Sequence, residues 1–195
     1  MRETKGRYSV LVASGSPQAA SFLKGLLPPD RFSATTMVNS AGEARRLLLT
    51  TPFDLLLINT PLPDEFGTQL AVQAGESSGC SVLLLVKNDM YEQVMYRLEG
   101  TGVLCLSKPC NAQMVYQATR MLIACRQQVE QLQQKNRSLQ ARMEEIRLIN
   151  RAKWVLIERF KMDEAQAHRT IEKQAMDTRS TRRAVAESIL RMYEN

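Results

Sequence analysis

The 195-residue sequence contains no long hydrophobic run, and this absence argues against a membrane-spanning helix. Its longest apolar runs, Leu55–Ile58 and Val82–Val86, are far shorter than the roughly 20 residues that a bilayer-spanning helix needs. The N-terminal residues carry charges but no apolar segment before the first predicted strand, so no signal peptide is expected. We therefore expect a cytoplasmic protein with no membrane partner.

Residues that bind metals or carry out catalysis are also few. The sequence has four cysteines and one histidine, His168, and the cysteines lack metal-ligand spacing. No nucleophile–base set or phosphate-binding loop is recognisable. We expect no catalytic residue, no metal and no cofactor, and we do not expect an enzyme. Free thiols at Cys80, Cys105, Cys110 and Cys125 are typical of a reducing compartment.

The charge is divided unevenly along the chain. Residues 1–118 carry ten basic and ten acidic side chains, whereas residues 119–195 carry sixteen basic and ten acidic ones, which accounts for the whole net charge of +6. A neutral region joined to a basic one suggests that the basic region meets a polyanion. A solvated basic helix face without a partner is the alternative on charge alone.

Short apolar runs alternate with amphipathic segments over residues 7–118. This alternation predicts βαβ units on a parallel sheet, and five such units give a doubly wound, flavodoxin-like α/β domain. The predicted strands are Tyr8–Ala13, Ser33–Val38, Asp54–Asn59, Ser81–Val86 and Gly102–Ser107, with helices near 17–27, 40–50, 66–76, 89–99 and from 111 onward.

Two segments of this region resemble marks of a response-regulator receiver domain. FDLLLINTPLPDEFG is similar to the third strand and the loop where that family places its phosphate-accepting aspartate. VLCLSKPCN is similar to the fifth strand and the Lys-Pro pair that follows it. The resemblance covers nearly all of residues 7–118 and implies the same fold.

The chemistry of a receiver does not follow from this resemblance. Receivers hold Mg²⁺ with two acidic residues after the first strand, where this sequence has Ala13 and Ser14. The acceptor position is Asn59, whose carboxamide cannot form an acyl phosphate, and of the family's set only Lys108 remains. Asp64, in the following loop, is interpreted as a turn residue. We predict a pseudo-receiver domain, residues 1–118, that is not phosphorylated and serves in docking and dimerisation.

The next region has a regular heptad pattern. From Val115 to Asn150 the apolar and asparagine positions are spaced alternately by three and four residues, without Gly or Pro. When the repeat is lettered a to g with Val115 at position a, Asn136 and Asn150 both fall at a. Asparagine at this position favours an in-register parallel dimer. We predict a dimerisation helix over residues 119–147, with these interface residues: Leu122, Val129, Leu132, Asn136, Leu139, Met143, Ile146 and Asn150. A single amphipathic helix that packs on its own domain is the alternative.

Residues 148–195 are predicted to form an all-α domain of three short helices. The first ends at Phe160, the second opens at a capping box of Asp163 and Gln166, and the third opens near Thr178 or Ser180. On the third helix, Arg179, Arg182 and Arg183 are expected to share one face.

The segment INRAKWVLIERFKMDEAQAHRTIEKQAMDTRSTRRAVAESIL, residues 149–190, resembles an ANTAR domain. This is the RNA-binding module of antitermination regulators of the AmiR/NasR type, whose order of domains the whole chain resembles. The resemblance implies binding to paired stem–loops in nascent RNA, which keeps a terminator hairpin from forming. A parallel dimer would present two identical heads to two hairpins. Candidate RNA contacts are Arg151, Lys153, Arg179, Thr181, Arg182 and Arg183.

Two questions stay open from the sequence. Trp154 stands where the family usually has glycine, and it can stack on a base or cover apolar surface, with packing the favoured interpretation. Two rival functions are a dimeric DNA-binding transcription factor and a protein-interaction adaptor. In the favoured hypothesis, a sensor or regulatory protein binds the pseudo-receiver or the coil.

Overall fold

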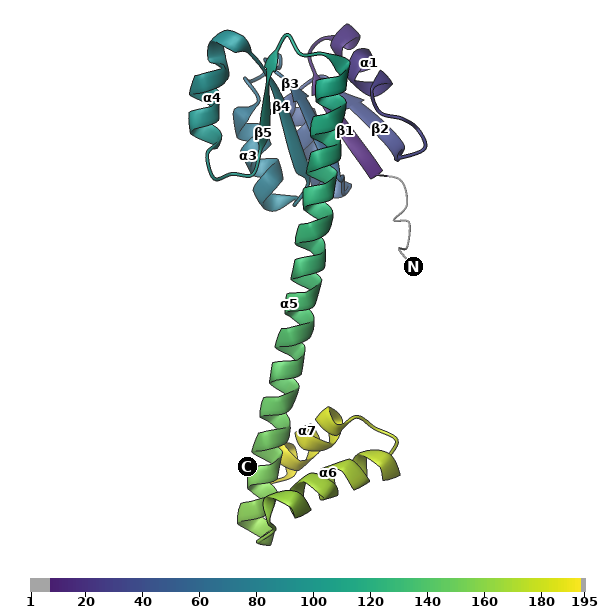
Figure 1. Cartoon of the computed structure of the whole chain (residues 1–195), viewed down its shortest axis with the longest axis vertical. Coiled ribbons are helices and arrows are strands. Elements are labelled where there is room, and N and C mark those ends of the chain that lie inside the picture. The colour runs from purple at the N-terminus through teal and green to yellow at the C-terminus, as the bar shows by residue number, and fades with distance from the viewer. Residues whose placement is uncertain (1–7, 194–195) are drawn as a thin grey trace. The chain divides into compact units, whose positions relative to one another are not determined.

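The computed structural model describes residues 8–193, which divide into two compact units on either side of the boundary between Val129 and Glu130. The first unit is an α/β domain and the second is wholly helical (Figure 1). Within residues 8–193, no helix combines the length and the apolar character that crossing a membrane would require.

A five-stranded parallel sheet forms the centre of the first unit, in the order β2-β1-β3-β4-β5. This order is that of a doubly wound fold with its switch point between β1 and β3, as the sequence predicted. The predicted strands are all present, with bounds that differ by at most two residues: β1 Tyr8–Ser14, β2 Phe32–Val38, β3 Leu55–Asn59, β4 Ser81–Lys87 and β5 Leu104–Lys108.

Helices cover both faces of this sheet because successive strand residues point to opposite sides. On β3, Leu56 and Ile58 face a core that includes residues of α2, α3 and α4, whereas Leu55 and Leu57 face α1 and α5. These residues are fully buried. The helix bounds are α1 Pro17–Gly25, α2 Ala41–Thr50, α3 Thr68–Ser77 and α4 Tyr91–Leu98, the last preceded by the short 3-10 helix η1 Asn88–Met90.

Helix α5 extends from Ala112 to Phe160 without interruption. In the first unit, Val115 and Ala118 are buried against the sheet and Leu122 packs beside them. The Arg126 guanidinium donates hydrogen bonds to the carbonyl oxygens of Asp54 (3.1 Å) and Gly79 (2.8 Å). These contacts attach the helix to the loops that precede β3 and β4.

The second unit consists of the end of α5 with α6, Glu164–Asp177, and α7, Arg182–Tyr193. The predicted capping box is present: Asp163 Oδ1 accepts from the Gln166 backbone N–H (2.7 Å), and Gln166 Oε1 accepts from the Asp163 N–H (3.0 Å). The core is small and built partly of alanines: Ala152, Leu156, Ala167, Ile171, Ala175, Val185, Ala186, Ile189 and Leu190.

The predicted start of the third helix is wrong by two or more residues. Helix α6 ends in a Schellman motif, in which the Ser180 N–H donates to the Ala175 carbonyl (2.9 Å) and Arg179 has a left-handed φ of 49°. Helix α7 therefore begins only at Arg182, where the Thr181 hydroxyl accepts from the Ala184 N–H (3.2 Å) as a cap. Arg179 and Thr181 lie before the helix, so the predicted three-arginine face does not exist.

Candidate functional site

Three polar side chains meet where β1, β3 and β5 end, and we call them the strand-end cluster: Ser14, Asn59 and Lys108. The Asn59 amide donates from Nδ2 to Ser14 Oγ (3.1 Å), and Lys108 Nζ donates to Asn59 Oδ1 (2.8 Å). Lys108 Nζ also donates to the Thr60 carbonyl (2.5 Å). Ser14, Asn59 and Lys108, at positions that the receiver resemblance singled out, are thus brought together and joined by hydrogen bonds.

The network contains one positive charge and no carboxylate. The acceptors recorded for Lys108 are neutral amide and carbonyl oxygens. Burial lowers the pKa of Lys108, and the ammonium of Lys87, its register partner on β4, lowers it further. Among residues 8–193, no group of three or more His, Cys, Asp or Glu side chains is placed to hold a metal ion.

Asp64 caps another element of the same unit. Its carboxylate accepts from the backbone N–H groups of Ala41 and Gly42, both at 2.9 Å, at the start of α2. These two hydrogen bonds lower the pKa of Asp64. The side chain therefore fixes the loop after β3 to the start of α2, a role over a long sequence separation that the interpretation as a turn residue did not include.

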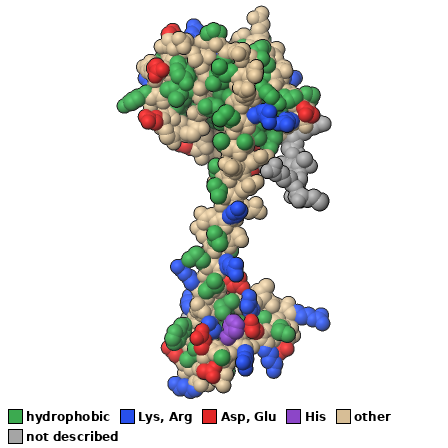
Figure 2. Space-filling model, in the orientation of Figure 1, with side chains coloured by type: hydrophobic (Ala, Val, Ile, Leu, Met, Phe, Trp, Pro, Cys, Tyr) green, Lys and Arg blue, Asp and Glu red, His purple; other side chains and the backbone are tan. Residues whose placement is uncertain are grey.

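A stripe of exposed apolar residues follows the heptad pattern along the middle of α5. Val129 is 52% exposed and Leu132 is 64% exposed, and similar exposure is found at Leu139, Met143 and Ile146. Figure 2 shows hydrophobic side chains at intervals along this length of the helix. We call Val129, Leu132, Leu139, Met143 and Ile146 the apolar stripe. Leu122, predicted for the same interface, instead lies half-buried against the core of its own unit.

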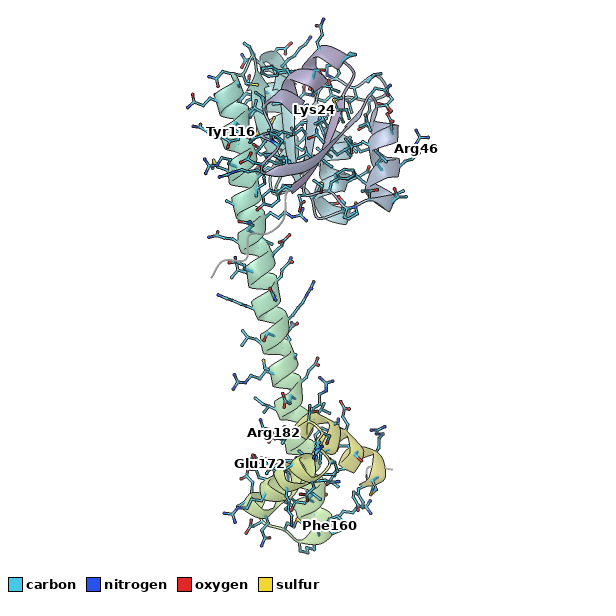
Figure 3. All side chains as sticks on the ribbon, turned by 90° about the vertical axis from the view of Figure 1, so that its right-hand side faces the viewer. Lys24, Arg46, Tyr116, Phe160, Glu172 and Arg182 are labelled. Atoms are coloured by element: carbon cyan, nitrogen blue, oxygen red, sulfur yellow. The ribbon has the colours of Figure 1, made fainter. Side chains whose placement is uncertain are left out.

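Several predicted RNA contacts take part in ion pairs at the surface of the second unit. Arg182 Nη1 lies 3.5 Å from Glu172 Oε1, and Figure 3 shows these two side chains close together. Arg183 Nε donates to Glu187 Oε1 (2.9 Å), which raises the pKa of Arg183. Lys153 Nζ lies 3.0 Å from Glu164 Oε1. The Lys153 side chain is only 15% exposed, whereas both side chains of the Arg182 and Arg183 pairs are exposed. Exposed pairs contribute little stability, so phosphate oxygens can replace the carboxylates beside Arg182 and Arg183.

Trp154 lies in a hollow on the surface of the same unit. Its side chain is 64% exposed, so the interpretation that it packs is wrong for this chain. The hollow has a volume of about 270 Å³ and is lined by Arg151, Trp154, Val155, Glu158, Arg159 and Tyr193. Arg159 and Tyr193 were not among the contacts predicted from the sequence. The spacing of Arg151, Val155, Glu158 and Arg159 along one helix side was a usable signal for the first of them.

Residues 137–190 match the ANTAR domain family model. The chain therefore carries an ANTAR domain that comprises the later part of α5 with α6 and α7. Over 181 residues the chain is 23% identical to "Transcriptional regulatory protein PdtaR" of Mycobacterium tuberculosis, strains CDC 1551 and H37Rv, and the match covers 93% of this chain and 88% of each relative. The similarity therefore extends over nearly the whole of this chain.

The first unit has the fold of solved receiver domains. A signal receiver domain from Pseudomonas fluorescens Pf-5 superimposes with a TM-score of 0.60 at 19% identity, covering 67% of this chain and 97% of that one. The chemotaxis response regulator CheY4 of Vibrio cholerae gives a TM-score of 0.52 at 16% identity, covering 60% and 98%. These likenesses confirm the predicted fold class.

Proposed function

We propose that this protein is a transcription antitermination regulator that binds paired stem–loops of nascent leader RNA through its ANTAR domain. The match of residues 137–190 to that family is the observation that carries the proposal. The charge supports it, because residues 119–195 carry the whole positive excess of the chain. A bound hairpin would prevent the alternative terminator hairpin from forming.

The proposal includes a parallel dimer through α5. Five large apolar side chains exposed along one side of a helix favour burial against an equivalent surface. Asn136 and Asn150 occupy a positions on the same side, where each would hydrogen-bond its twin. The dimer would carry two RNA-binding heads, so binding of one hairpin would raise the effective concentration of the second.

The receiver-like unit is proposed to act without phosphorylation. Asn59 offers an amide that is already hydrogen-bonded to Ser14 and Lys108. Control would therefore come from a sensor or regulatory protein that binds this unit or the coil and changes access to the heads. Acetyl phosphate with Mg²⁺ should leave the intact mass of the protein unchanged. A stoichiometric, hydroxylamine-labile adduct would contradict this part of the proposal.

The RNA-binding proposal is tested by comparing hairpins with duplex DNA. Full-length protein should bind paired stem–loops recovered by crosslinking in the host more tightly than duplex DNA of equal length. Arg182→Ala and Arg183→Ala should each flatten the dependence of log affinity on log salt by about 0.7–0.9 if a phosphate contact is lost. Arg46→Ala, which removes an arginine at an exposed position of α2 in the first unit, is the control and should leave this salt dependence unchanged.

Preferential binding to duplex DNA would favour a DNA-binding factor instead. Binding to neither nucleic acid would favour the protein-interaction adaptor. Circular dichroism of each variant must show unchanged helicity before a loss of affinity is assigned to a contact.

A further inference from the structure

The only tryptophan in the sequence lies at the surface of the second unit. Trp154 is 64% exposed, while Ala152 and Leu156, two residues to either side, are buried in the core. An indole ring is one of the largest apolar groups in proteins and is usually covered when it has no partner to bind. The side of α5 that carries Trp154 therefore offers a wide aromatic surface to a molecule outside the unit.

The surroundings of Trp154 combine a flat aromatic ring with opposite charges. Arg151 and Arg159 lie on either side of it along α5, and Glu158 lies between them in the lining of the hollow. The Arg159 guanidinium donates to the Tyr193 carbonyl (2.9 Å), which holds it at the edge of the hollow. Tyr193 in turn packs edge-on against Phe160, with ring centroids 5.3 Å apart. The hollow is thus built from groups on both α5 and α7.

We propose that this hollow binds one unpaired nucleobase of the RNA, stacked on the Trp154 indole. Sequence-specific RNA recognition uses aromatic platforms for bases that are splayed out of loops, with cations on the neighbouring phosphates. Arg151 and Arg159 are placed to pair the flanking phosphates. The Glu158 carboxylate accepts hydrogen bonds only, so it favours a base with an exocyclic amino group, namely adenine, cytosine or guanine. Uracil is disfavoured because its single N3–H donor is flanked by two carbonyl oxygens that repel the carboxylate.

This inference rests on the proposed RNA-binding function and adds a second contact surface to α7. A twin Trp154 from a second copy is the competing occupant, because the apolar stripe ends at Ile146, about two turns earlier on α5. The heptad favours RNA: Trp154 follows the a-position Asn150 by four residues and so falls at e, beside the seam rather than in it. A symmetric seam would also bring like-charged arginines of two chains together.

The single tryptophan gives a direct measurement on the full-length protein. The probe is a pair of adjacent RNA stem–loops whose loops are randomised in sequence, enriched by binding to the protein. Binding should quench tryptophan fluorescence, and Trp154→Ala should weaken binding of the same RNA by roughly five- to a hundred-fold. Trp154→Phe should recover part of the affinity. Met176→Ala, which removes another exposed apolar side chain of this unit, should leave affinity unchanged.

Base selection is tested by Glu158→Gln. A carboxamide can also donate, so this variant should lose the preference for an amino-bearing base over uracil at the contacted loop position while it retains quenching. Two results together would overturn the inference and leave the proposed function intact. The Trp154→Ala variant would bind the RNA with full affinity, and the tryptophan fluorescence of the wild type would not change when RNA binds. If the wild type binds no RNA, the proposed function itself fails, and the inference with it.

The competing occupant has its own signature. Acrylamide should quench Trp154 efficiently in the RNA-free protein, because the ring is exposed. A ring that is shielded from acrylamide, and whose emission changes on dilution without RNA, would assign the hollow to a second copy and overturn the inference.

Discussion

The two units of this protein provide different partners for their basic side chains. In the first unit, Lys108 at the end of β5 is held by neutral oxygens of Asn59 and Thr60. In the second unit, Lys153, Arg182 and Arg183 are paired with carboxylates at the surface. The first arrangement is part-buried and joins the ends of strands, whereas the Arg182 and Arg183 pairs of the second unit are exposed and can exchange partners.

The difference determines which of the two units can exchange its hydrogen-bond and ion-pair partners for those of a ligand. Replacing the partners of Lys108 would leave a polar group at the end of the sheet without its hydrogen bond, which is costly. Replacing Glu172 beside Arg182 with a phosphate oxygen exchanges one anion for another at little cost. The same contrast holds for apolar groups: the first unit buries Val115 and Ala118 of α5, but the apolar stripe is left uncovered.

The largest expected effect is on the apolar stripe. Replacing Leu132 and Leu139 together by lysine should convert a dimer into a 22.1 kDa monomer, because the change removes four seam leucines per dimer, each worth about 1.5–3 kcal/mol when buried. Sedimentation equilibrium gives the mass. Gln134→Lys with Ala141→Lys adds the same charge on the opposite side of the helix and should leave the dimer intact. A wild type that is monomeric at micromolar concentration would contradict the proposed coil.

The next effect is on the small core of the second unit. Ile171 is 1% exposed, and Ile171→Ala should cost about 2–5 kcal/mol. Leu57→Ala, in the sheet, should cost a similar amount, but the larger core of the first unit should keep that variant folded. Thermal melting followed by circular dichroism, together with RNA binding, distinguishes the two. The prediction would be contradicted if Ile171→Ala kept its RNA affinity and Leu57→Ala lost it, because RNA binding would then depend on the core of the first unit and not on that of the second.

The substitution Lys108→Met tests the hydrogen bonds of the strand-end cluster in the first unit. The substitution leaves Asn59 Oδ1 and the Thr60 carbonyl without this donor and should lower the free energy of unfolding by about 1–3 kcal/mol. RNA affinity should not change. Lys24→Met, at an exposed position of α1, is the matched control in urea unfolding. An equal loss in both variants would mean that the strand-end cluster contributes no special stability.

The smallest effect concerns the exchangeable pairs of the second unit. Glu172→Gln removes a negative charge beside Arg182 and should raise RNA affinity by about two- to five-fold at low salt, with the gain shrinking as salt increases. Glu76→Gln makes the same change of charge at an exposed position of the first unit and should have no effect. Filter binding at several salt concentrations measures both. Weaker binding by Glu172→Gln would show that this carboxylate positions Arg182 rather than competing for it.

The first unit was predictable because its signals are local and repeated. Each strand is a short apolar run, such as Leu55–Ile58, and each lies between amphipathic segments, so the parallel topology followed from the pattern alone. The hydrogen bond from Lys108 to Asn59 was not predicted, because 49 residues separate the two in the sequence. Their nearness is a result of strand order, which places the ends of β3 and β5 on one edge of the sheet, with β4 between them.

The second unit was predicted less well in the places that matter for binding. The capping box has a defined spacing and was identified correctly, but the Schellman motif places arginine in a left-handed conformation that usually takes glycine. The segment therefore had no glycine to mark the end of α6. The exposure of Trp154 was also hidden, because the side of a helix that faces the core depends on where its partners lie.

The strand-end cluster also limits what a single substitution can introduce at this edge of the sheet. Asn59→Asp would place one carboxylate beside the Lys108 ammonium, which now donates to the Asn59 amide. An acidic residue in place of Ala13 or Ser14 would leave Asn59 as an amide, which cannot form an acyl phosphate. No one of these changes supplies both a carboxylate acceptor and a pair of acidic side chains for a metal ion, so at least two substitutions are needed to build both.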